Sequence, residues 1–338
     1  MRKLNNLLLL ASIALLAGCA AQGNDSEKAN EATSEVYEPA GIVKPVNFEY
    51  ENKEKFKVIS WNVEHFLDEH DNPYINNGRE DEPAERMGDK PAMLVKALKE
   101  VNADIIVLQE FESASYLRAL AQDSLLKDLG YRYFADAPSH TWYMNVVVMS
   151  KVPLGVLYAY GNVTTPLPNY TNDEGKAESQ NRINTRMWSI DVYPDEDYSF
   201  VLTGLHLKAG RGPRNIAMRT GQINFLRGQF DRFLRENPNK NILVVGDLNC
   251  TPDSEEYKVL LGDAASNVQF TDPLDTAILT HPADEPRRRL DHMLANNNMA
   301  KEIVAESVHV PYIFSKEEMR TLSDHLPVVG EFYLDDKN

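Results

Sequence analysis

The strongest constraint on this chain is a repeated pattern in which a short aliphatic run ends in polar residues. The runs that read as strands cover residues 56–60, 105–108, 242–245 and 328–334. The polar residues next to them are Asn62, Glu110, Asp247, Asn249, Asp324 and His325. Short apolar runs bounded by polar groups are typical of buried strands. Polar residues gathered at strand ends from distant segments indicate a functional site rather than a core.

The remaining segments predict an α/β protein. Further strands are predicted at residues 146–149, 154–158, 188–192, 200–204, 290–294 and 303–309. Helices are predicted at residues 90–101, from Ser113 onward, at 213–235 and at 255–261. Strand–helix–strand units occur beside a hairpin at residues 188–204, so neither strict alternation nor an all-strand pattern is present. We therefore expect a four-layer α/β/β/α sandwich, in which helices flank two packed mixed sheets.

The first residues resemble a targeting signal. Arg2 and Lys3 precede an apolar segment at residues 7–16, which is too short to span a bilayer. The segment continues as Leu16-Ala17-Gly18-Cys19, which resembles a bacterial lipobox. This pattern predicts a lipoprotein signal peptide at residues 1–18 and lipidation of Cys19. Ala at position 20, rather than Asp, favours the outer membrane in the Gram-negative sorting pattern.

Residues 19–47 are rich in Ala, Asn, Glu, Ser and Lys and show no hydrophobic period, so we expect a polar tether after the lipidated cysteine. One folded domain is then expected at residues 48–338. Contact with the membrane is expected through the N-terminal lipid only, which places the domain at the cell envelope. No protein partner is predicted.

The charge and the cysteines limit the chemistry. The formal net charge of −16 repels nucleic acid and anionic membranes at long range. It does not exclude an anionic substrate, because a metal ion or a local basic patch inverts the field inside a cleft. Cys250 is the only cysteine besides Cys19, so an intramolecular disulfide is unavailable once Cys19 is modified. We interpret Cys250 as a small buried residue.

Three further segments carry charge without a clear motif. Residues 67–89 contain Asp68-Glu69-His70-Asp71-Asn72, and residues 164–185 contain Asn172-Asp173-Glu174-Gly175. Their oxygen ligands could bind calcium by spacing, but neither has the full EF-hand pattern, and solvated loops are the favoured interpretation. Arg287-Arg288-Arg289 is expected to be exposed.

The ordered motifs resemble the endonuclease/exonuclease/phosphatase superfamily, which contains deoxyribonuclease-I-like nucleases, base-excision nucleases, inositol phosphatases and neutral sphingomyelinases. The resemblance spans about residues 56–334. It rests on Ser60-Trp61-Asn62, Leu108-Gln109-Glu110, His206 in Gly-Leu-His-Leu-Lys, Gly246-Asp247-Leu248-Asn249, Asp291 in Arg-Leu-Asp-His-Met, and Ser323-Asp324-His325. Each motif is weak alone, but six in this order are specific.

The resemblance implies a metal-dependent phosphoester hydrolase. Glu110 is expected to bind Mg²⁺ or Mn²⁺, with Asn62 and Asp324 in support, and Ca²⁺ is a further candidate. Asp247 is expected to position or deprotonate the attacking water. Asn249, two residues later, reaches the same face in an extended segment.

Three further groups complete the expected catalytic set. His325 resembles the family's catalytic histidine, and Asp291 its orienting carboxylate. His206 is expected to donate to the phosphate or to the leaving oxygen.

Substrate contacts are less well marked. Arg186 precedes a strand, Asn145 begins one, and Arg211 lies just before a predicted helix N-terminus, where glycines and arginines suit an anion. A phosphodiester is the expected substrate, with nucleic acid as the leading class. A lipid or sugar phosphoester is the second hypothesis, for which Pro311-Tyr312-Ile313-Phe314 is the sole short apolar candidate for bilayer contact. A non-catalytic binding lipoprotein is the third.

Overall fold

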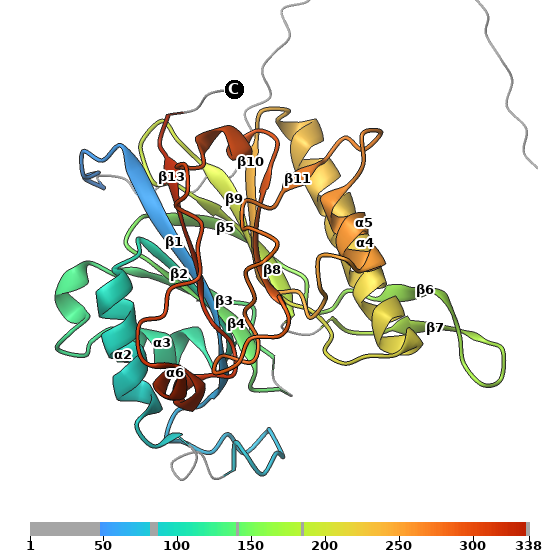
Figure 1. The fold of residues 1–338 in the computed structure, drawn as a ribbon, viewed down its shortest axis with the longest axis horizontal. Coiled ribbons are helices and arrows are strands. Elements are labelled where there is room, and N and C mark those ends of the chain that lie inside the picture. Colours follow the sequence, from blue (N-terminus) through green and yellow to red (C-terminus); the bar gives the residue numbers. More distant parts are fainter. Residues whose placement is uncertain (1–47, 82–86, 140–141, 184–185, 336–338) are drawn as a thin grey trace, which may run out of the picture. The chain divides into compact units, whose positions relative to one another are not determined.

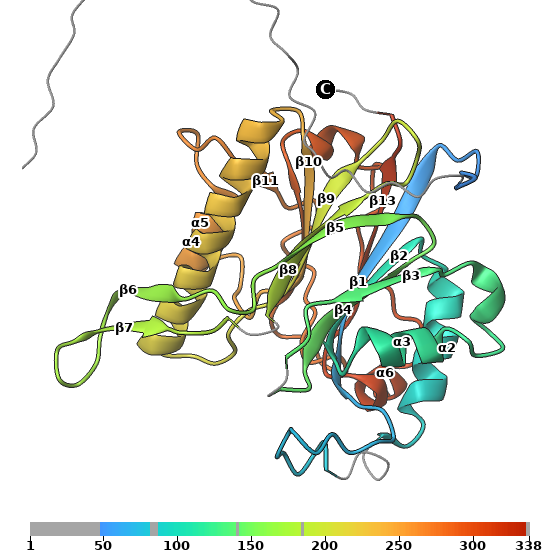
Figure 2. The ribbon, with the colours of Figure 1, turned by 180° about the vertical axis from the view of Figure 1, so that it is seen from behind.

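Two mixed β-sheets pack face to face at the centre of the fold (Figures 1 and 2). The structure is a computed structural model and describes residues 48–81, 87–139, 142–183 and 186–335. The predicted signal peptide, Cys19 and the tether lie outside these residues. The described residues form one compact unit by their contacts.

The first sheet has five strands. Their order is β13 (Val328–Tyr333), β1 (Lys55–Phe66), β2 (Ile105–Phe111), β4 (Asn145–Ser150) and β3 (Tyr133–Asp136). Only β1 and β2 are parallel neighbours, and the other pairs are antiparallel. Buried β-branched and aliphatic residues fill the central strands, which explains why the sequence pattern identifies them.

The second sheet has six strands. Their order is β11 (Phe270–Thr271), β12 (Asp291–Asn296), β10 (Asn241–Asp247), β9 (Phe200–His206), β8 (Met187–Val192) and β5 (Leu154–Ala159). Here β9 and β10 are the parallel pair. The predicted hairpin is confirmed, because Trp188 in β8 pairs with Gly204 in β9.

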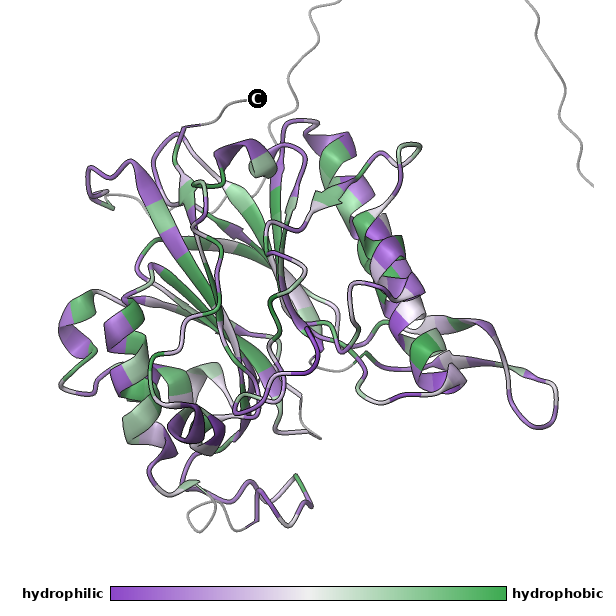
Figure 3. Cartoon of the chain, viewed as in Figure 1, coloured by the Kyte–Doolittle hydropathy of each residue, from purple (hydrophilic) through white to green (hydrophobic). Residues whose placement is uncertain are grey.

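Helices cover the outer face of each sheet, so the predicted four-layer sandwich is confirmed (Figures 1 and 3). The first sheet packs against α2 (Lys90–Val101), α3 (Ala114–Leu120) and α6 (Lys316–Leu322). The second packs against α4 (Pro213–Glu236) and α5 (Glu255–Leu261). A third apolar cluster, which includes Val107, Trp188 and Val245, lies between the two sheets.

Local sequence signals set the helix starts. The Ser113 hydroxyl accepts a hydrogen bond from the Tyr116 N–H, as expected for an N-cap. Pro213 occupies the first turn of α4, where its missing N–H leaves no helix hydrogen bond unmade. Two short 3-10 helices, η1 (Lys127–Leu129) and η2 (Met299–Glu302), complete the helical elements of the described residues. Within these residues, no helix combines the length and the apolar character needed to cross a bilayer.

Some predicted elements were wrong or missed. Residues 303–309 do not form a strand: they meet β13 through isolated bridges at Ile303 and His309 and through separate hydrogen bonds of Val304 and Ser307 with Glu331. A turn interrupts the segment, with the Ser307 N–H bonded to the Val304 carbonyl and Glu306 at φ +59°. The sequence pattern also missed β3, α6, the short β11 and the ribbon of β6 (Thr165–Thr171) and β7 (Ala177–Gln180). The ribbon packs on α4 and lies within the stretch that was expected to be a loop.

The parallel pairs determine where polar side chains collect. The carboxyl ends of β1 and β2 lie at one edge of the first sheet, and those of β9 and β10 at one edge of the second. β12 runs antiparallel to β10, so its first residue, Asp291, pairs with Asp247. Contacts of β1 and β2 with β10 bring these edges together.

Gly246 is required for this arrangement. Its φ is +137°, and a Cβ atom there would lie 1.9 Å from the Leu205 carbonyl oxygen in the neighbouring strand β9. A side chain would therefore push β10 away from β9 at the residue before Asp247.

We predict that Gly246→Ala lowers the free energy of unfolding by about 2 kcal/mol or more, because it combines backbone strain with a backbone clash. Urea denaturation followed by circular dichroism measures the change. Gly228→Ala is the matched control: Gly228 lies within α4 and has open space around it. That variant should gain roughly 0.5–1 kcal/mol from the better helix propensity of alanine. Equal stabilities of the two variants would contradict the assigned role of Gly246.

Candidate active site

Asp247 is the centre of a buried polar cluster at the joined edges of the two sheets. Its side chain is almost fully buried, and its Oδ2 accepts hydrogen bonds from Asn62 Nδ2 at 3.1 Å and from Asn249 Nδ2 at 3.1 Å. Its Oδ1 accepts from the Asn249 backbone N–H at 2.7 Å. Burial raises the pKa of the Asp247 carboxyl, and the nearby Asp291 raises it further, while His325 and His206 oppose the rise. These contacts fix the carboxylate in one orientation and make it a stronger base.

Asn249 meets Asp247 for a different reason than the sequence suggested. The expected geometry was an extended segment, in which alternate side chains share a face. Instead Asn249 has φ +52°, and the chain turns directly after β10. The turn lets Asn249 Nδ2 contact both Asp247 and the Leu207 carbonyl. Strained residues of this kind are common at functional sites.

Glu110 is placed by irregularities in two strands. The pairing of β1 with β2 shifts register between Asn62 and Phe66, and the pairing of β2 with β4 shifts between Gln109 and Phe111. Glu110 has φ +58°. Bulges of this type redirect a side chain near the end of a strand. The Glu110 carboxylate consequently faces the cluster, with Oε1 3.2 Å from Asn62 Nδ2 and 3.8 Å from His206 Nε2.

The surroundings of Glu110 favour its charged form. Burial alone raises its pKa, but the His206 and His65 imidazoles and the Asn62 amide outweigh burial, so the pKa lies below its ordinary value. The His65 backbone N–H also donates to Oε2 at 3.0 Å. An ionised carboxylate beside amide and imidazole groups is a suitable donor for a hard divalent cation, so Glu110 fits the role of a metal ligand.

Asn62 supports the carboxylates through its nitrogen. Its Nδ2 bridges Glu110 and Asp247, which come from different sheets, and its Oδ1 accepts from the Glu64 N–H at 3.1 Å. In this arrangement Asn62 orients both carboxylates. The Ser323 hydroxyl donates to the Asn62 carbonyl, which ties the segment before His325 to β1.

His325 and Asp291 form a close buried pair. His325 Nδ1 lies 2.8 Å from Asp291 Oδ2, and His325 Nε2 lies 3.8 Å from Asp247 Oδ2. Burial lowers the pKa of His325, but the Asp291 and Asp247 carboxylates outweigh it and raise the pKa to about 10. His325 is therefore an imidazolium at neutral pH, held with Nε2 toward Asp247.

Asp324 belongs to a neighbouring group of side chains. Its carboxylate contacts His281 Nε2 at 3.3 Å and His325 Nε2 at 3.8 Å. Burial raises its pKa, but the hydrogen bond from His281 and the charge of His325 lower it to about 2. Asp324, His281 and His325 have polar side-chain atoms within 4.8 Å of one another, but the imidazolium form of His325 cannot ligate a metal, so Asp324 and His281 are the candidate ligands of this group. Asp324 thus lies beside the histidines, and Glu110 beside Asn62.

The three predicted substrate contacts lie in different surroundings. Arg186 is largely buried near the cluster, where its guanidinium interacts with the charges of Asp247 and Glu110. Arg211 lines a cavity of about 640 Å³ together with Asn249 and Arg288. Asn145 is buried and donates to the backbone carbonyls of Glu112 and Tyr143, so its contacts hold the end of β2.

Two histidines of the site were missed by the sequence prediction. His281 contacts Asp324 and stacks edge-on against His325, with ring centroids 4.7 Å apart. His65 lies 3.7 Å from Glu110 and contacts the Tyr143 hydroxyl. His65 could have been found, because it follows Asn62 by three residues. His281 lies in an irregular segment and has no local signal.

Two neighbouring residues are structural. Cys250 is buried, as the sequence predicted, and burial raises the pKa of its thiol to about 12. Arg289 is buried against Asp272, contrary to the expected exposure of all three arginines. It also donates to the Leu274 and Asp275 carbonyls, so it braces the chain before β12.

Comparison with known proteins identifies the family of the chain and solved structures of the same fold. The model of the Endonuclease/Exonuclease/phosphatase family matches residues 59–325. No curated protein matches the chain. Among solved structures, the human Nocturnin catalytic domain with bound sulfate anion is 17% identical, with a TM-score of 0.54, over 84% of this chain and 96% of that one.

Two other structures show the same fold. An endonuclease/exonuclease/phosphatase from Beutenbergia cavernae DSM 12333 is 21% identical, with a TM-score of 0.54, over 83% of this chain and 72% of that one. D. rerio TDP2 complexed with single strand DNA product is 16% identical, with a TM-score of 0.54, over 83% of this chain and 99% of that one.

We predict that the His325–Asp291 pair makes stability depend on alkaline pH. The pKa of His325 is raised in the folded protein, so the stabilisation that the charged His325–Asp291 pair provides is fully present below the ordinary histidine value of 6.5. It is lost as the pH rises toward 10, where His325 loses its proton. In EDTA, the free energy of unfolding should fall by about 1–3 kcal/mol over that range. Asp291→Asn removes the main partner, so its profile should be flatter. Urea denaturation at pH 6.5, 8 and 9.5 makes the comparison, and parallel profiles would contradict the pairing.

Proposed function

The chain belongs to the endonuclease/exonuclease/phosphatase family, and on this premise we propose that it is a divalent-metal-dependent phosphodiesterase with nucleic acid as its leading substrate. The observation that carries the proposal is the convergence on Asp247 of Asn62, Asn249, His206 and His325. These side chains come from both sheets and surround one carboxylate with amide and imidazole groups. Polar side chains of this kind from distant segments indicate a functional site rather than a hydrophobic core.

The residues divide the chemistry of phosphoester hydrolysis between them. Asp247 orients a water molecule and accepts its proton, which its raised pKa favours. The His325 imidazolium stabilises negative charge that grows on the phosphoryl oxygens, and Asp291 holds its ring in place. His206 donates to a phosphoryl or leaving oxygen, and Asn249 holds the Asp247 carboxylate in place through its backbone N–H and its side-chain amide.

A divalent cation would be held at Glu110, with Asn62 orienting the carboxylate and the Asp324 group nearby. When bound, Mg²⁺ or Mn²⁺ supplies Lewis-acid polarisation of a phosphate oxygen. The ionised state of Glu110 supports this assignment, because a hard cation prefers charged oxygen ligands.

The cavity beside Asn249 favours a diester over a small monoester. It measures about 640 Å³ and its lining contains Arg211, Arg219 and Arg288 as well as Asp253, Glu255 and Glu256, so it offers space and arginine donors for a second part of the substrate without a net positive charge. Among structures of the same fold, D. rerio TDP2 was captured with a single strand DNA product.

A lipid phosphoester has less support. The short apolar candidate for bilayer contact leaves only Tyr312 exposed, at 47%, because Ile313 and Phe314 pack against the core of the first sheet.

We further propose that the lipobox anchors this activity at the outer membrane through lipidated Cys19, and palmitate labelling of wild type and Cys19→Ala tests that location.

Asp247→Asn and Glu110→Gln should each lower the rate by about 10²–10⁴-fold, because one removes the base and the other the metal ligand. Rates would be measured on plasmid DNA, RNA, bis-p-nitrophenyl phosphate, p-nitrophenyl phosphate and sphingomyelin, with Mg²⁺, Mn²⁺ or EDTA. Both variants should keep the wild-type circular dichroism spectrum. Asp263→Asn, at an exposed turn, is the charge-matched control. Full activity of Asp247→Asn on the cleaved substrate would overturn the assignment.

Arg211→Ala should raise the KM for DNA by roughly fivefold or more while leaving the hydrolysis of p-nitrophenyl phosphate nearly unchanged, because the cavity contacts the substrate away from the reacting phosphate. Steady-state kinetics on both substrates separates the effects. Arg235→Ala, exposed in the last turn of α4, is the matched control. An equal loss on both substrates would place Arg211 at the reacting phosphate, and cleavage of sphingomyelin alone would favour the lipid hypothesis.

A further inference from the structure

The segment that joins β1 to α2 carries a group of carboxylates outside the proposed active site. Asp71, Glu80 and Asp81 each offer one carboxylate oxygen, and these atoms lie within 4.8 Å of one another. Asp71 and Asp81 are exposed, whereas Glu80 is fully buried. A group of exposed acids alone would be unremarkable, so the buried member is the informative one.

Glu80 is only half satisfied by the protein. Its Oε1 accepts a hydrogen bond from the Asn72 N–H at 2.6 Å. Its Oε2 is buried and has no hydrogen-bond partner among the described residues. Burying a carboxylate oxygen without a partner is unfavourable, and more so when the group is charged. The free oxygen is also the one that is available to a ligand.

The charges around Glu80 increase this cost. Glu80 is buried, and its carboxylate lies within 4.8 Å of those of Asp71 and Asp81. Three acidic groups at this spacing repel one another unless a cation lies between them. The sequence favoured a solvated loop here, and the burial of Glu80 is the observation that changes this interpretation.

We propose that Asp71, Glu80 and Asp81 form a calcium-binding site that is separate from the catalytic metal position. The ion would use the unpartnered Oε2 of Glu80 and one oxygen from each aspartate, and water would complete its shell.

The donor chemistry selects calcium. Every donor in the set is a carboxylate oxygen, whereas zinc and copper sites normally include imidazole or thiolate ligands. The three residues come from an irregular loop, which suits the variable coordination of Ca²⁺ better than the strict octahedron of Mg²⁺.

The second acidic segment does not offer a comparable unpartnered oxygen at Asn172. This residue, at the tip of the β6–β7 ribbon, uses its side-chain oxygen to accept from the Glu174 and Lys176 N–H groups.

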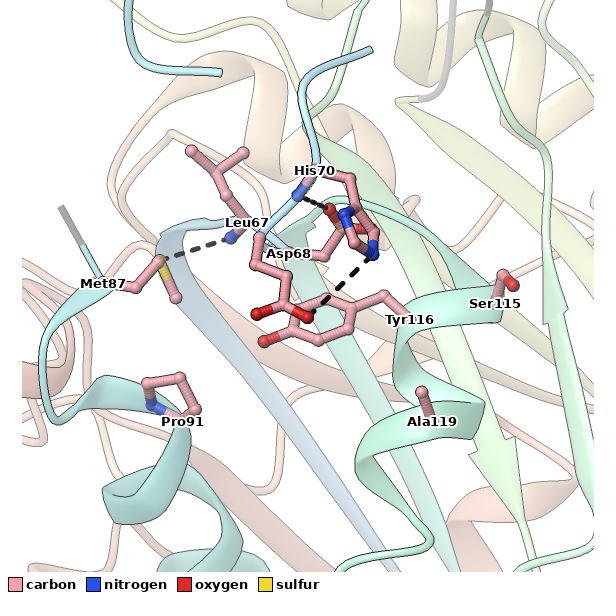
Figure 4. Close-up of a pocket in the computed structure, with 9 residues that line it drawn as sticks. Leu67, Asp68, His70, Met87, Pro91, Ser115, Tyr116 and Ala119 are labelled. Atoms are coloured by element: carbon pink, nitrogen blue, oxygen red, sulfur yellow. Dashed lines mark hydrogen bonds and ion pairs between the residues drawn. The ribbon is translucent and has the colours of Figure 1, made fainter. Parts of the chain in front are cut away.

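The proposed ion would hold a loop that borders the active site. Arg79, next to Glu80, lines a cavity of about 360 Å³ with His65 and Lys90, and His65 contacts Glu110. The start of the same loop covers a second cavity of about 470 Å³, where Figure 4 shows Leu67 and Asp68 opposite Tyr116 of α3. Calcium would thus fix the wall of the site without taking part in hydrolysis.

The test measures Ca²⁺ binding in the full chain with the catalytic position disabled by Glu110→Gln. In that background, isothermal titration with Ca²⁺ should show one site, and a hundredfold excess of Ca²⁺ over its dissociation constant should raise Tm by about 4–8 °C. Adding Glu80→Gln should weaken binding by roughly tenfold or more and abolish most of the rise in Tm. Asp81→Asn, which changes an exposed ligand, should also weaken Ca²⁺ binding.

The matched control is Glu69→Gln, which removes one exposed charge from the same loop and should leave Ca²⁺ binding unchanged. In EDTA, Glu80→Gln should be at least as stable as its parent, because the substitution removes a buried, repelled charge. This result would distinguish a lost ligand from a damaged fold. Absence of Ca²⁺ binding in the Glu110→Gln protein, or equal effects of Glu80→Gln and Glu69→Gln, would overturn the proposal. Neither result bears on phosphodiesterase activity, which is measured separately.

Discussion

The amide nitrogen of Asn62 connects the two sheets at the point where the chemistry is expected. It donates to Glu110 in its own sheet and to Asp247 in the other, so the two carboxylates hold fixed positions. The remaining groups are arranged around this link: Asn249 completes the contacts of Asp247, and His206 lies between Glu110 and Asp247. Buried polar groups of this kind are stable only when their hydrogen bonds are satisfied together, which makes the cluster sensitive to the packing of both sheets.

Backbone irregularity and electrostatics support the same arrangement. Glu110 and Asn249 both adopt left-handed conformations, and each turns a side chain into the cluster that a regular strand would direct elsewhere. The histidines compensate for the burial of negative charge: His206 helps to keep Glu110 ionised, and His325 is kept protonated by Asp291 and Asp247. Strain and buried charge are therefore concentrated at one edge of an otherwise regular sandwich.

Much of the fold could be predicted from local patterns. The helix at residues 90–101 and the central strands follow from hydrophobic periodicity, because they bury one face or both faces of a segment. The failures occurred where neighbours decide the structure. Residues 303–309 have strand-like composition, but a turn around Glu306 interrupts their pairing with β13. The β6–β7 ribbon is polar and gains its order by packing on α4.

The sequence by itself determined which residues could carry the chemistry, because acidic, amide and imidazole side chains follow buried strands at recognisable positions. It also determined the layer order, through the alternation of apolar runs and amphipathic segments. Only the tertiary structure decided that His281 and His65 join the site, that Asp324 contacts histidines, and that Glu80 is buried. These features depend on contacts between segments far apart in the chain and on strained turns, and neither has a local periodicity that a sequence pattern could reveal.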